Sequence, residues 1–160
     1  MEATNSQMQL GSGGKILTVL LGGHAYGIEL LDSKEVIAMM AVEPIPQAPP
    51  YLLGMINLRG RLIPVMDLRI KLGITPSPPT PESCIIIVDQ KGRLLGALVD
   101  ALIGVTTLEP GNYVDHPNLG EQVHVDFLKG IGKQQNDLIY ILDLDKVFSQ
   151  SMELETQEAL

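Results

Sequence analysis

The sequence predicts a mainly β protein, built from small barrels or a sandwich, with little helix. Short apolar runs alternate with Gly- and Pro-containing turns at the spacing typical of such folds. The chain also repeats itself: Ile16 aligns with Ile85 and Gly27 with Gly96, and later Gly54 aligns with Gly130. A repeated unit predicts two related structures packed against each other, with a groove between them for a partner.

The first half of the chain is predicted to contain short strands and one short helix. Gly22 and Gly23 can both adopt the positive φ of a two-residue hairpin turn. Asp67 can cap a helix over 68–72, and Gly73 can end it. The expected strands span residues 15–21, 24–30 and 34–40, with a short extension at 42–46 and a hairpin over 55–66.

A connector with four prolines, residues 74–82, separates the halves and is expected to be extended and semi-rigid. After it the plan repeats. A polar loop is predicted at 109–122, a polar turn at 133–136 and a second short helix at 144–148. The expected strands span residues 84–89, 93–99, 103–108 and 138–142.

These elements predict a domain organisation of two units between polar tails. The first unit spans about 15–73 and the second about 83–150, with an exchange of strands between them left open. Residues 1–14 are polar and rich in Gly and Ser, which predicts a disordered tail. Residues 151–160 form an acidic tail.

Composition limits the class of function. The 160 residues carry a net charge of −8, which disfavours nucleic-acid partners because phosphate neutralisation needs clustered Lys and Arg. No apolar run has the length needed to cross a bilayer, so no membrane insertion is expected. One cysteine and no signal-like N-terminus indicate a cytoplasmic protein.

Candidates for catalysis are few. Cys84 lies in an aliphatic run and is interpreted as a small buried hydrophobe rather than a nucleophile. The three histidines show no metal-ligand spacing. The sequence therefore predicts no enzyme, no metal and no cofactor, and a small enzyme centred on Cys84 or a histidine is kept as the competing hypothesis.

Residues 54–69 are unusually dense in basic side chains, with Arg59, Arg61 and Arg69 among the chain's 11 Lys and Arg residues. Arg59 is expected at a hairpin tip held by Gly60. An arginine fixed in this way can offer its planar fork to a carboxylate. Arg59 therefore either contacts a partner directly or has a mainly structural role.

The segment Met-Ile-Asn-Leu-Arg-Gly-Arg-Leu-Ile-Pro-Val-Met-Asp-Leu-Arg at 55–69 resembles the signature of the CheW family of bacterial chemotaxis coupling proteins. Tyr-Gly-Ile-Glu-Leu-Leu at 26–31, Leu-Lys-Gly-Ile-Gly at 128–132 and Leu-Ile-Tyr-Ile-Leu-Asp-Leu-Asp-Lys-Val at 138–147 also fit. The resemblance covers about residues 15–150.

The resemblance implies two five-stranded SH3-like β-barrels packed on a shared apolar core. It also implies a non-catalytic adaptor that couples the cytoplasmic tips of chemoreceptors to the histidine kinase CheA. The regulatory domain of that kinase has a similar double barrel, so the two proteins can pair barrel to barrel. The alternative is a CheW-like coupling module of a receptor–kinase pathway that does not control motility.

By position, Glu35 and Arg59 match family residues that matter for coupling, and they are expected to pair across neighbouring strands. The protein is expected to be a monomer in isolation, cytoplasmic, and recruited to membrane receptor arrays. Position alone selects the remaining predicted partner-binding residues: Ile37, Met39, Met55, Ile56, Asn57 and Leu58.

Overall fold

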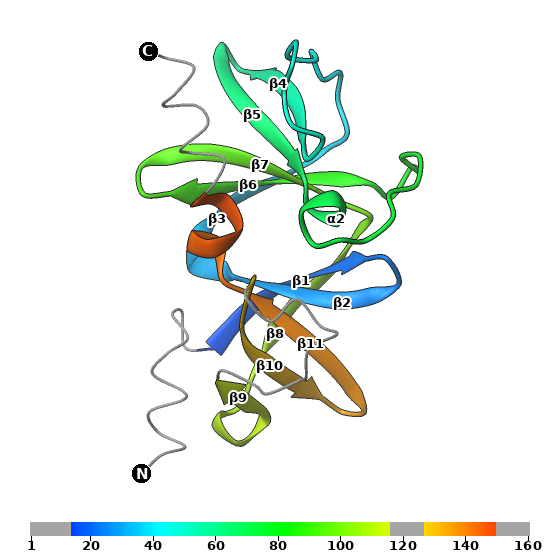
Figure 1. Ribbon diagram of the computed structural model, residues 1–160. Coiled ribbons are helices and arrows are strands. Elements are labelled where there is room, and N and C mark those ends of the chain that lie inside the picture. Colours follow the sequence, from blue (N-terminus) through cyan, green and yellow to red (C-terminus); the bar gives the residue numbers. More distant parts are fainter. Residues whose placement is uncertain (1–13, 116–126, 150–160) are drawn as a thin grey trace.

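The computed structural model describes residues 14–115 and 127–149, in which strands dominate and helices are short (Figure 1). This confirms the prediction of a mainly β protein. Apart from Gly14, the predicted tails at 1–14 and 151–160 lie outside the described residues. The strands are β1 (Lys15–Leu21), β2 (His24–Glu29), β3 (Ser33–Ala38), β4 (Leu52–Leu58), β5 (Arg61–Asp67), β6 (Cys84–Gln90), β7 (Arg93–Val99), β8 (Ala101–Thr107), β9 (Tyr113–Asp115), β10 (Leu128–Gln134) and β11 (Asp137–Leu142). The short helices are η2 (Leu30–Asp32), α2 (Leu68–Lys71), η3 (Pro110–Asn112) and a helical segment at 144–149.

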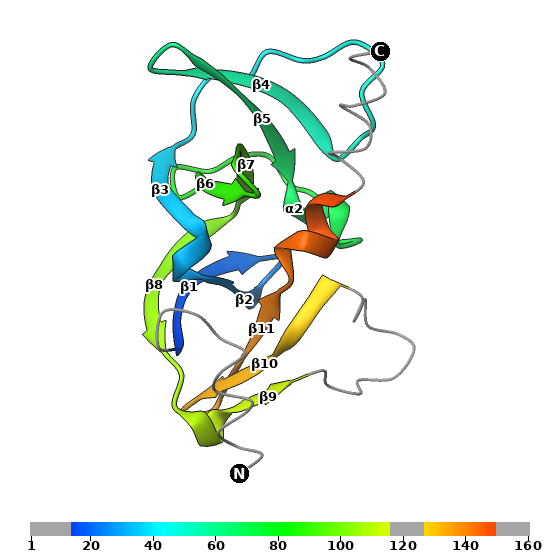
Figure 2. The same ribbon diagram turned by 90° about the vertical axis from the view of Figure 1, so that its left-hand side faces the viewer.

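The strands form two sheets that lie one above the other (Figures 1 and 2). One has the order β3-β6-β7-β5-β4 and is called barrel 1, and the other has the order β8-β1-β2-β11-β10-β9 and is called barrel 2. Each sheet combines strands from both halves of the chain. The β6–β7 hairpin lies among β3, β4 and β5, and the β1–β2 hairpin lies among β8 to β11.

Both sheets curl so that their end strands are connected. In barrel 1, Glu43 follows β3 and forms a bridge to Met55 on β4, with backbone N···O distances of 2.8 and 2.9 Å. In barrel 2 the end strands β8 and β9 are consecutive in the chain and are joined through η3. These connections leave less sheet edge open to other chains than two flat sheets would, which matters in a protein this rich in aliphatic strands.

The repeat seen in the sequence is reproduced in the strand registers. Ile16 lies opposite Glu29 in the β1–β2 hairpin, and Ile85 lies opposite Leu98 in the β6–β7 hairpin. The β4–β5 and β10–β11 hairpins also share a register, as do the parallel contacts β5–β7 and β11–β2. Residues that occupy the same register position in the two barrels are called counterparts below.

The described residues form three apolar clusters, one inside each barrel and a larger one shared between the barrels. The side chains of strand β6 contribute to two clusters, one on each face of the strand. Ile85 and Ile87 point into barrel 1, whereas Ile86 and Val88 point into the shared cluster. Because successive side chains face opposite sides of a strand, a strand buried on both faces needs an unbroken apolar run.

Local details partly match the sequence predictions. Asp67 caps α2 as expected, its carboxylate accepting a hydrogen bond of 3.0 Å from the Arg69 backbone N–H. Strand β9 corrects the prediction of a loop over 109–122, because Tyr113 is buried in the barrel 2 cluster and the segment pairs with β10. Strand β10 likewise extends two residues into the turn predicted at 133–136. None of the described helices has the length and apolar character needed to span a membrane.

Candidate functional site: docking surfaces on the double barrel

Charged side chains surround one end of barrel 1, where the β4–β5 and β6–β7 turns lie on the left of Figure 1. They line a groove of about 510 Å³ together with apolar residues at its base. This surface is called the charged end. Its ionisable members are Lys34, Glu35, Arg59, Arg61 and Asp89.

Arg59 stands at the tip of the β4–β5 hairpin, as the sequence predicts. Its φ is +51° and that of Gly60 is +86°, so both residues of the turn adopt left-handed backbone conformations. Asn57 supports the turn, because its Oδ1 accepts a hydrogen bond of 2.9 Å from the Gly60 N–H. A left-handed conformation disfavours most side chains, so the turn holds Arg59 in a strained position at the surface.

Arg59 and Glu35 form the expected ion pair through Arg59 Nη2 and Glu35 Oε1. The expectation that they pair across neighbouring strands is wrong: β3 and β4 are the two end strands of barrel 1. The pair therefore joins the end strands of the curled sheet at its rim. The Arg59 side chain is 68% exposed and Glu35 is 36% exposed, so water screens the pair and its contribution to stability is small.

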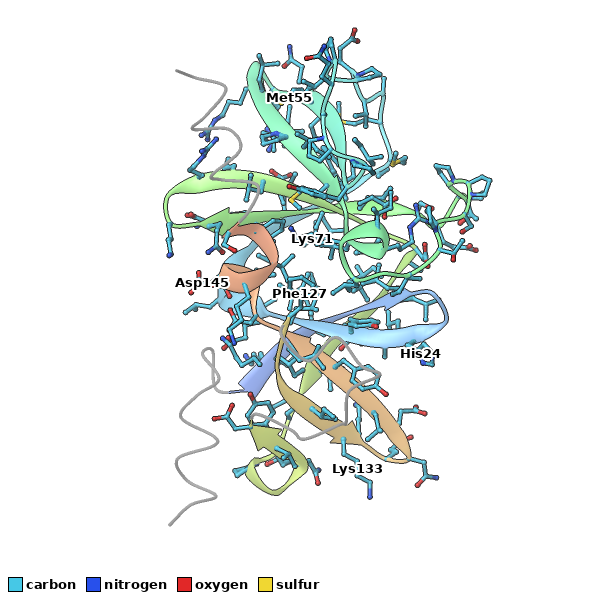
Figure 3. The ribbon with its side chains drawn as sticks, in the orientation of Figure 1. His24, Met55, Lys71, Phe127, Lys133 and Asp145 are labelled. Carbon is cyan, nitrogen blue, oxygen red and sulfur yellow. The ribbon has the colours of Figure 1, made fainter. Side chains whose placement is uncertain are left out.

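The predicted apolar contacts differ in burial, and Met39 also lines a separate groove beside the proline-rich connector. Ile37, Met39 and Leu58 are half-buried and pack against the barrel 1 cluster. Ile56 is 1% exposed and belongs to that cluster, so it supports the surface from below rather than meeting solvent. Met55 is half-buried beside the bridge to Glu43, in the upper part of barrel 1 in Figure 3.

A second exposed surface was not identified from the sequence. Val36, Leu102 and Val105 are 38%, 42% and 58% exposed on strands β3 and β8. Val36 lies opposite Ile86 and Val105 opposite Leu17, and both of these partners belong to the shared cluster. Residues opposite each other in an antiparallel pair share a face, so these three side chains continue the shared cluster to the surface. They are called the apolar strip.

The apolar strip crosses the boundary between the barrels. Strand β3 is an end strand of barrel 1 and β8 is an end strand of barrel 2, and Figure 2 shows both on the same side of the molecule. Exposed apolar side chains on unpaired strand edges are uncommon because such edges invite association. The strip is therefore a candidate docking surface.

Groups suited to catalysis do not converge in the described part of the chain. Cys84 is buried, as predicted, and burial raises the pKa of its thiol, which disfavours the nucleophilic thiolate. Residues 14–115 and 127–149 contain no cluster of three or more His, Cys, Asp or Glu side chains that could hold a metal ion. His24 lies at the start of β2, and the other two histidines lie outside the described residues.

The double barrel, the charged end and the apolar strip define a scaffold or adaptor class of protein. Residues 15–152 match the CheW-like domain family. The chain is 30% identical over 146 residues to the chemotaxis protein CheW of Rhizobium meliloti, covering 91% of this chain and 94% of that protein. It is 32% identical over 148 residues to CheW of Bacillus subtilis, covering 89% and 94%.

A solved structure supports the same assignment. The crystal structure of the scaffolding protein TtCheW from Thermoanaerobacter tengcongensis matches with a TM-score of 0.79 and 32% identity, over 84% of this chain and 92% of that one. The chain therefore belongs to the CheW family of chemotaxis scaffold proteins. Its fold is the pair of SH3-like β-barrels that the sequence resemblance implied. The expectation of five strands in each barrel holds for barrel 1 but not for barrel 2, whose sheet has six strands because β9 is added to it.

Proposed function

We propose that this chain is a non-catalytic adaptor that couples the cytoplasmic tips of chemoreceptors to the histidine kinase CheA. The observation that carries the proposal is Arg59, which a strained turn holds at the exposed rim of barrel 1 in a pair with Glu35. A pair this exposed contributes little to folding, which favours a role in binding over a role in folding. Family membership supports the chemotaxis setting.

The charged end is the proposed site for the regulatory domain of CheA. Its half-buried base, which includes Leu58 and Leu94, offers apolar contact, and its rim carries both signs of charge. Lys34 and Asp89 form a further exposed pair there, 3.7 Å apart. Interfaces commonly combine an apolar centre with a charged rim that sets register and excludes wrong partners. Met55, Asn57, Ile37 and Met39 are proposed to support or border the contact.

The apolar strip is the proposed site for the receptor tip. A helix can bury its apolar face in a groove between two elements, and the strip lies where the shared cluster reaches the surface. Glu35 and Val36 are consecutive on β3, so the charged end and the apolar strip meet on this strand. Each partner then has its own surface on one body.

In this proposal the protein acts in the cytoplasm, is recruited to receptor arrays at the membrane, and needs no cofactor. It is a monomer until it meets its partners. The signal is transmitted through the relative positions of the two partners, because both docking surfaces belong to one folded unit and share strand β3.

The first test is Arg59→Asp, measured as the dissociation constant for the CheA regulatory domain by titration calorimetry. Reversing the charge replaces the pair with repulsion from Glu35, and we expect a loss of about tenfold or more, equivalent to ~1.4 kcal/mol. The matched control is Gln135→Asp, because Gln135 is the counterpart of Arg59 in barrel 2 and has a φ of +57°. Equal binding by Arg59→Asp and wild type, with intact circular dichroism, would refute the assignment of the charged end.

The second test is Val105→Asp, measured as binding to a receptor-tip fragment. A charge in the apolar strip would have to be desolvated on docking, so binding should fall while CheA binding is unchanged. Val114→Asp is the control, because Val114 is 60% exposed on β9 of the same barrel but outside the strip. If Val114→Asp weakened receptor binding as much as Val105→Asp, the strip would lose its assignment.

A further inference from the structure

Arg69 is a buried cation that none of the proposed docking surfaces uses. It is 4% exposed, and its guanidinium is bonded on every side. Nε and Nη2 donate to the two carboxylate oxygens of Asp67 at 2.9 Å each, and Nη1 donates at 2.9 Å to Asp100 Oδ1 and to the Ser77 carbonyl. One side chain therefore connects the end of β5, the proline-rich connector and the turn between β7 and β8.

Asp100 carries this network from one barrel to the other. It lies between β7 of barrel 1 and β8 of barrel 2. Its other oxygen, Oδ2, accepts a hydrogen bond of 2.8 Å from the Gly22 N–H in the β1–β2 turn of barrel 2, and its own N–H donates to the Leu20 carbonyl at 3.0 Å. The turn also approaches the connector closely, because a Cβ at Gly22 would lie 2.6 Å from the Ile74 side chain.

The second crossing between the barrels is built differently. There η2 links β2 to β3, and Leu31 is the counterpart of Asp100. Leu31 is 71% exposed and carries no charge, so no equivalent ion pair can form at its position. The counterpart of Arg69 is Asp145, which accepts a hydrogen bond from Gln90 Nε2. The two crossings are thus related by the repeat but not by their chemistry.

We propose that Arg69 and Asp100 form a strap that fixes the orientation of barrel 2 relative to barrel 1 and so positions β8 relative to β3. Arg69 is a positioning residue in this role. Asp100 directly precedes β8, so the strap holds the start of the strand that carries Leu102 and Val105 of the apolar strip. The side chains packed inside each barrel do not belong to the strap, so their packing should be unchanged in variants that lack it.

The test measures the distance between the barrels without any partner, so its outcome is independent of the proposed function. Spin labels are placed at Val36→Cys on β3 and Val105→Cys on β8, in a Cys84→Ala background, and the distance distribution is recorded by double electron–electron resonance. The wild-type strap should give one narrow distribution. Asp100→Ala removes both bonds of the carboxylate and should broaden or shift the distribution while the far-ultraviolet circular dichroism is kept.

Two matched variants make the result specific. Ser83→Ala is the control, because Ser83 Oγ also accepts a hydrogen bond from a turn N–H, that of Thr80 at 2.8 Å, and this bond does not cross between the barrels. It should leave the distribution unchanged. Ile63→Val, in the barrel 1 cluster, lowers stability without touching the strap and should also leave it unchanged.

A milder pair of changes keeps the test valid if Asp100→Ala does not fold. Asp100→Asn keeps one carbonyl oxygen but loses the charge, and Arg69→Lys keeps the charge but loses the planar fork that reaches Asp67 and Asp100 together. Both should broaden the distribution, less than Asp100→Ala does. Folded strap variants whose distributions superimpose on that of the wild type would overturn the proposal.

Discussion

The ends of the two barrels have the same backbone plan and inverted polarity. At the charged end of barrel 1, the base of the groove is apolar, formed by Ile87 with Ile37 and Leu58 packed against the same cluster. In barrel 2 a groove of about 420 Å³ occupies the equivalent place. Its base instead contains three polar side chains joined by hydrogen bonds, Thr18, Thr106 and Gln134. They are the counterparts of Ile87, Ile37 and Leu58, respectively.

The rims of the two grooves also differ, but here barrel 1 is charged and barrel 2 is apolar. Gly104 is the counterpart of Glu35, and Gln135 is the counterpart of Arg59, so barrel 2 has no equivalent of the rim ion pair. Ile103 and Leu138 are 57% and 49% exposed there. Main-chain hydrogen bonds and glycine turns maintain the repeated fold, and the side chains at each end are free to diverge. The barrels therefore supply a scaffold, and the side chains at their ends give each barrel its own surface chemistry.

The largest effect on stability should come from placing a polar side chain in the base of barrel 1, compared with an apolar one in the base of barrel 2. Ile87→Thr places a hydroxyl among apolar side chains and leaves a cavity, and we expect a loss of about 2–4 kcal/mol in the free energy of unfolding. Thr18→Val in barrel 2 leaves Thr106 bonded to Gln134, and we expect a cost of about 1 kcal/mol or less. Urea denaturation measures both. Equal losses in the free energy of unfolding for the two variants would show that the polarity of the two bases does not affect stability.

The next effect tests how tightly each barrel packs around its counterpart glycine. A Cβ at Gly27 would lie 2.4 Å from the Ile16 side chain, whereas a Cβ at Gly96 would lie 2.9 Å from that of Ile85. Both Ala variants should destabilise the protein by about 1–3 kcal/mol through overpacking, Gly27→Ala more than Gly96→Ala. Thermal melting monitored by circular dichroism gives the order. A Gly27→Ala variant that melts at or above the wild-type temperature would contradict the packing described for barrel 2.

A smaller effect, dependent on pH, is expected at the crossing that has no strap. Burial, with the nearby charge of Glu29, raises the pKa of Asp32 above its ordinary value. The folded protein then binds this proton more tightly than the unfolded chain, so the contribution to stability is favourable at low pH and is lost as pH rises through the raised pKa. Asp32→Asn should therefore stabilise the protein at neutral pH, and the gain should vanish as pH falls below the ordinary carboxyl range.

The control for this pH dependence is Asp137→Asn, at an exposed carboxylate on β11. Denaturant midpoints of wild type and both variants are compared between acidic and neutral pH. A gain for Asp32→Asn that is independent of pH would mean that the removed charge is not its cause.

The smallest effect is expected from the rim pair itself. A double-mutant cycle over Glu35→Ala and Arg59→Ala should give a coupling energy of about 0–1 kcal/mol for unfolding, decreasing with salt, because both side chains are partly exposed. The same variants should weaken CheA binding clearly. A coupling of several kcal/mol in unfolding would instead assign the pair the structural role that the sequence left open for Arg59.

Local features of the fold could be predicted from the sequence because their causes are local. Gly22-Gly23 and Arg59-Gly60 mark hairpin turns, and Asp67 marks a helix start, each through backbone chemistry within a few residues. The exchange of hairpins between the barrels depends on parallel pairing of β5 with β7 and of β2 with β11, which joins distant segments. A run such as Ile85–Val88 indicates a strand but not which of two clusters each side chain enters.

The candidate site was predictable to a similar extent. The turn at Arg59-Gly60 and the pairing of Arg59 with Glu35 could be predicted because the motif is dense and the family resemblance is specific, whereas their role in binding stays a prediction. The apolar strip was missed because Val36, Leu102 and Val105 read as ordinary strand residues, and their exposure follows from β3 and β8 being end strands. Ile56 was chosen by position, yet it is buried. The sequence could not show this, because the inner and outer faces of β4 cannot be told apart without the neighbouring strand.

An adaptor needs two surfaces that can be occupied at the same time. The most direct measurement mixes the protein with the CheA regulatory domain and a receptor-tip fragment and determines the mass of the resulting species by analytical ultracentrifugation. The account predicts a complex containing all three components, reduced to receptor plus adaptor by Arg59→Asp and to kinase plus adaptor by Val105→Asp. Mutually exclusive binding, with one partner displacing the other from the wild-type protein, would contradict it.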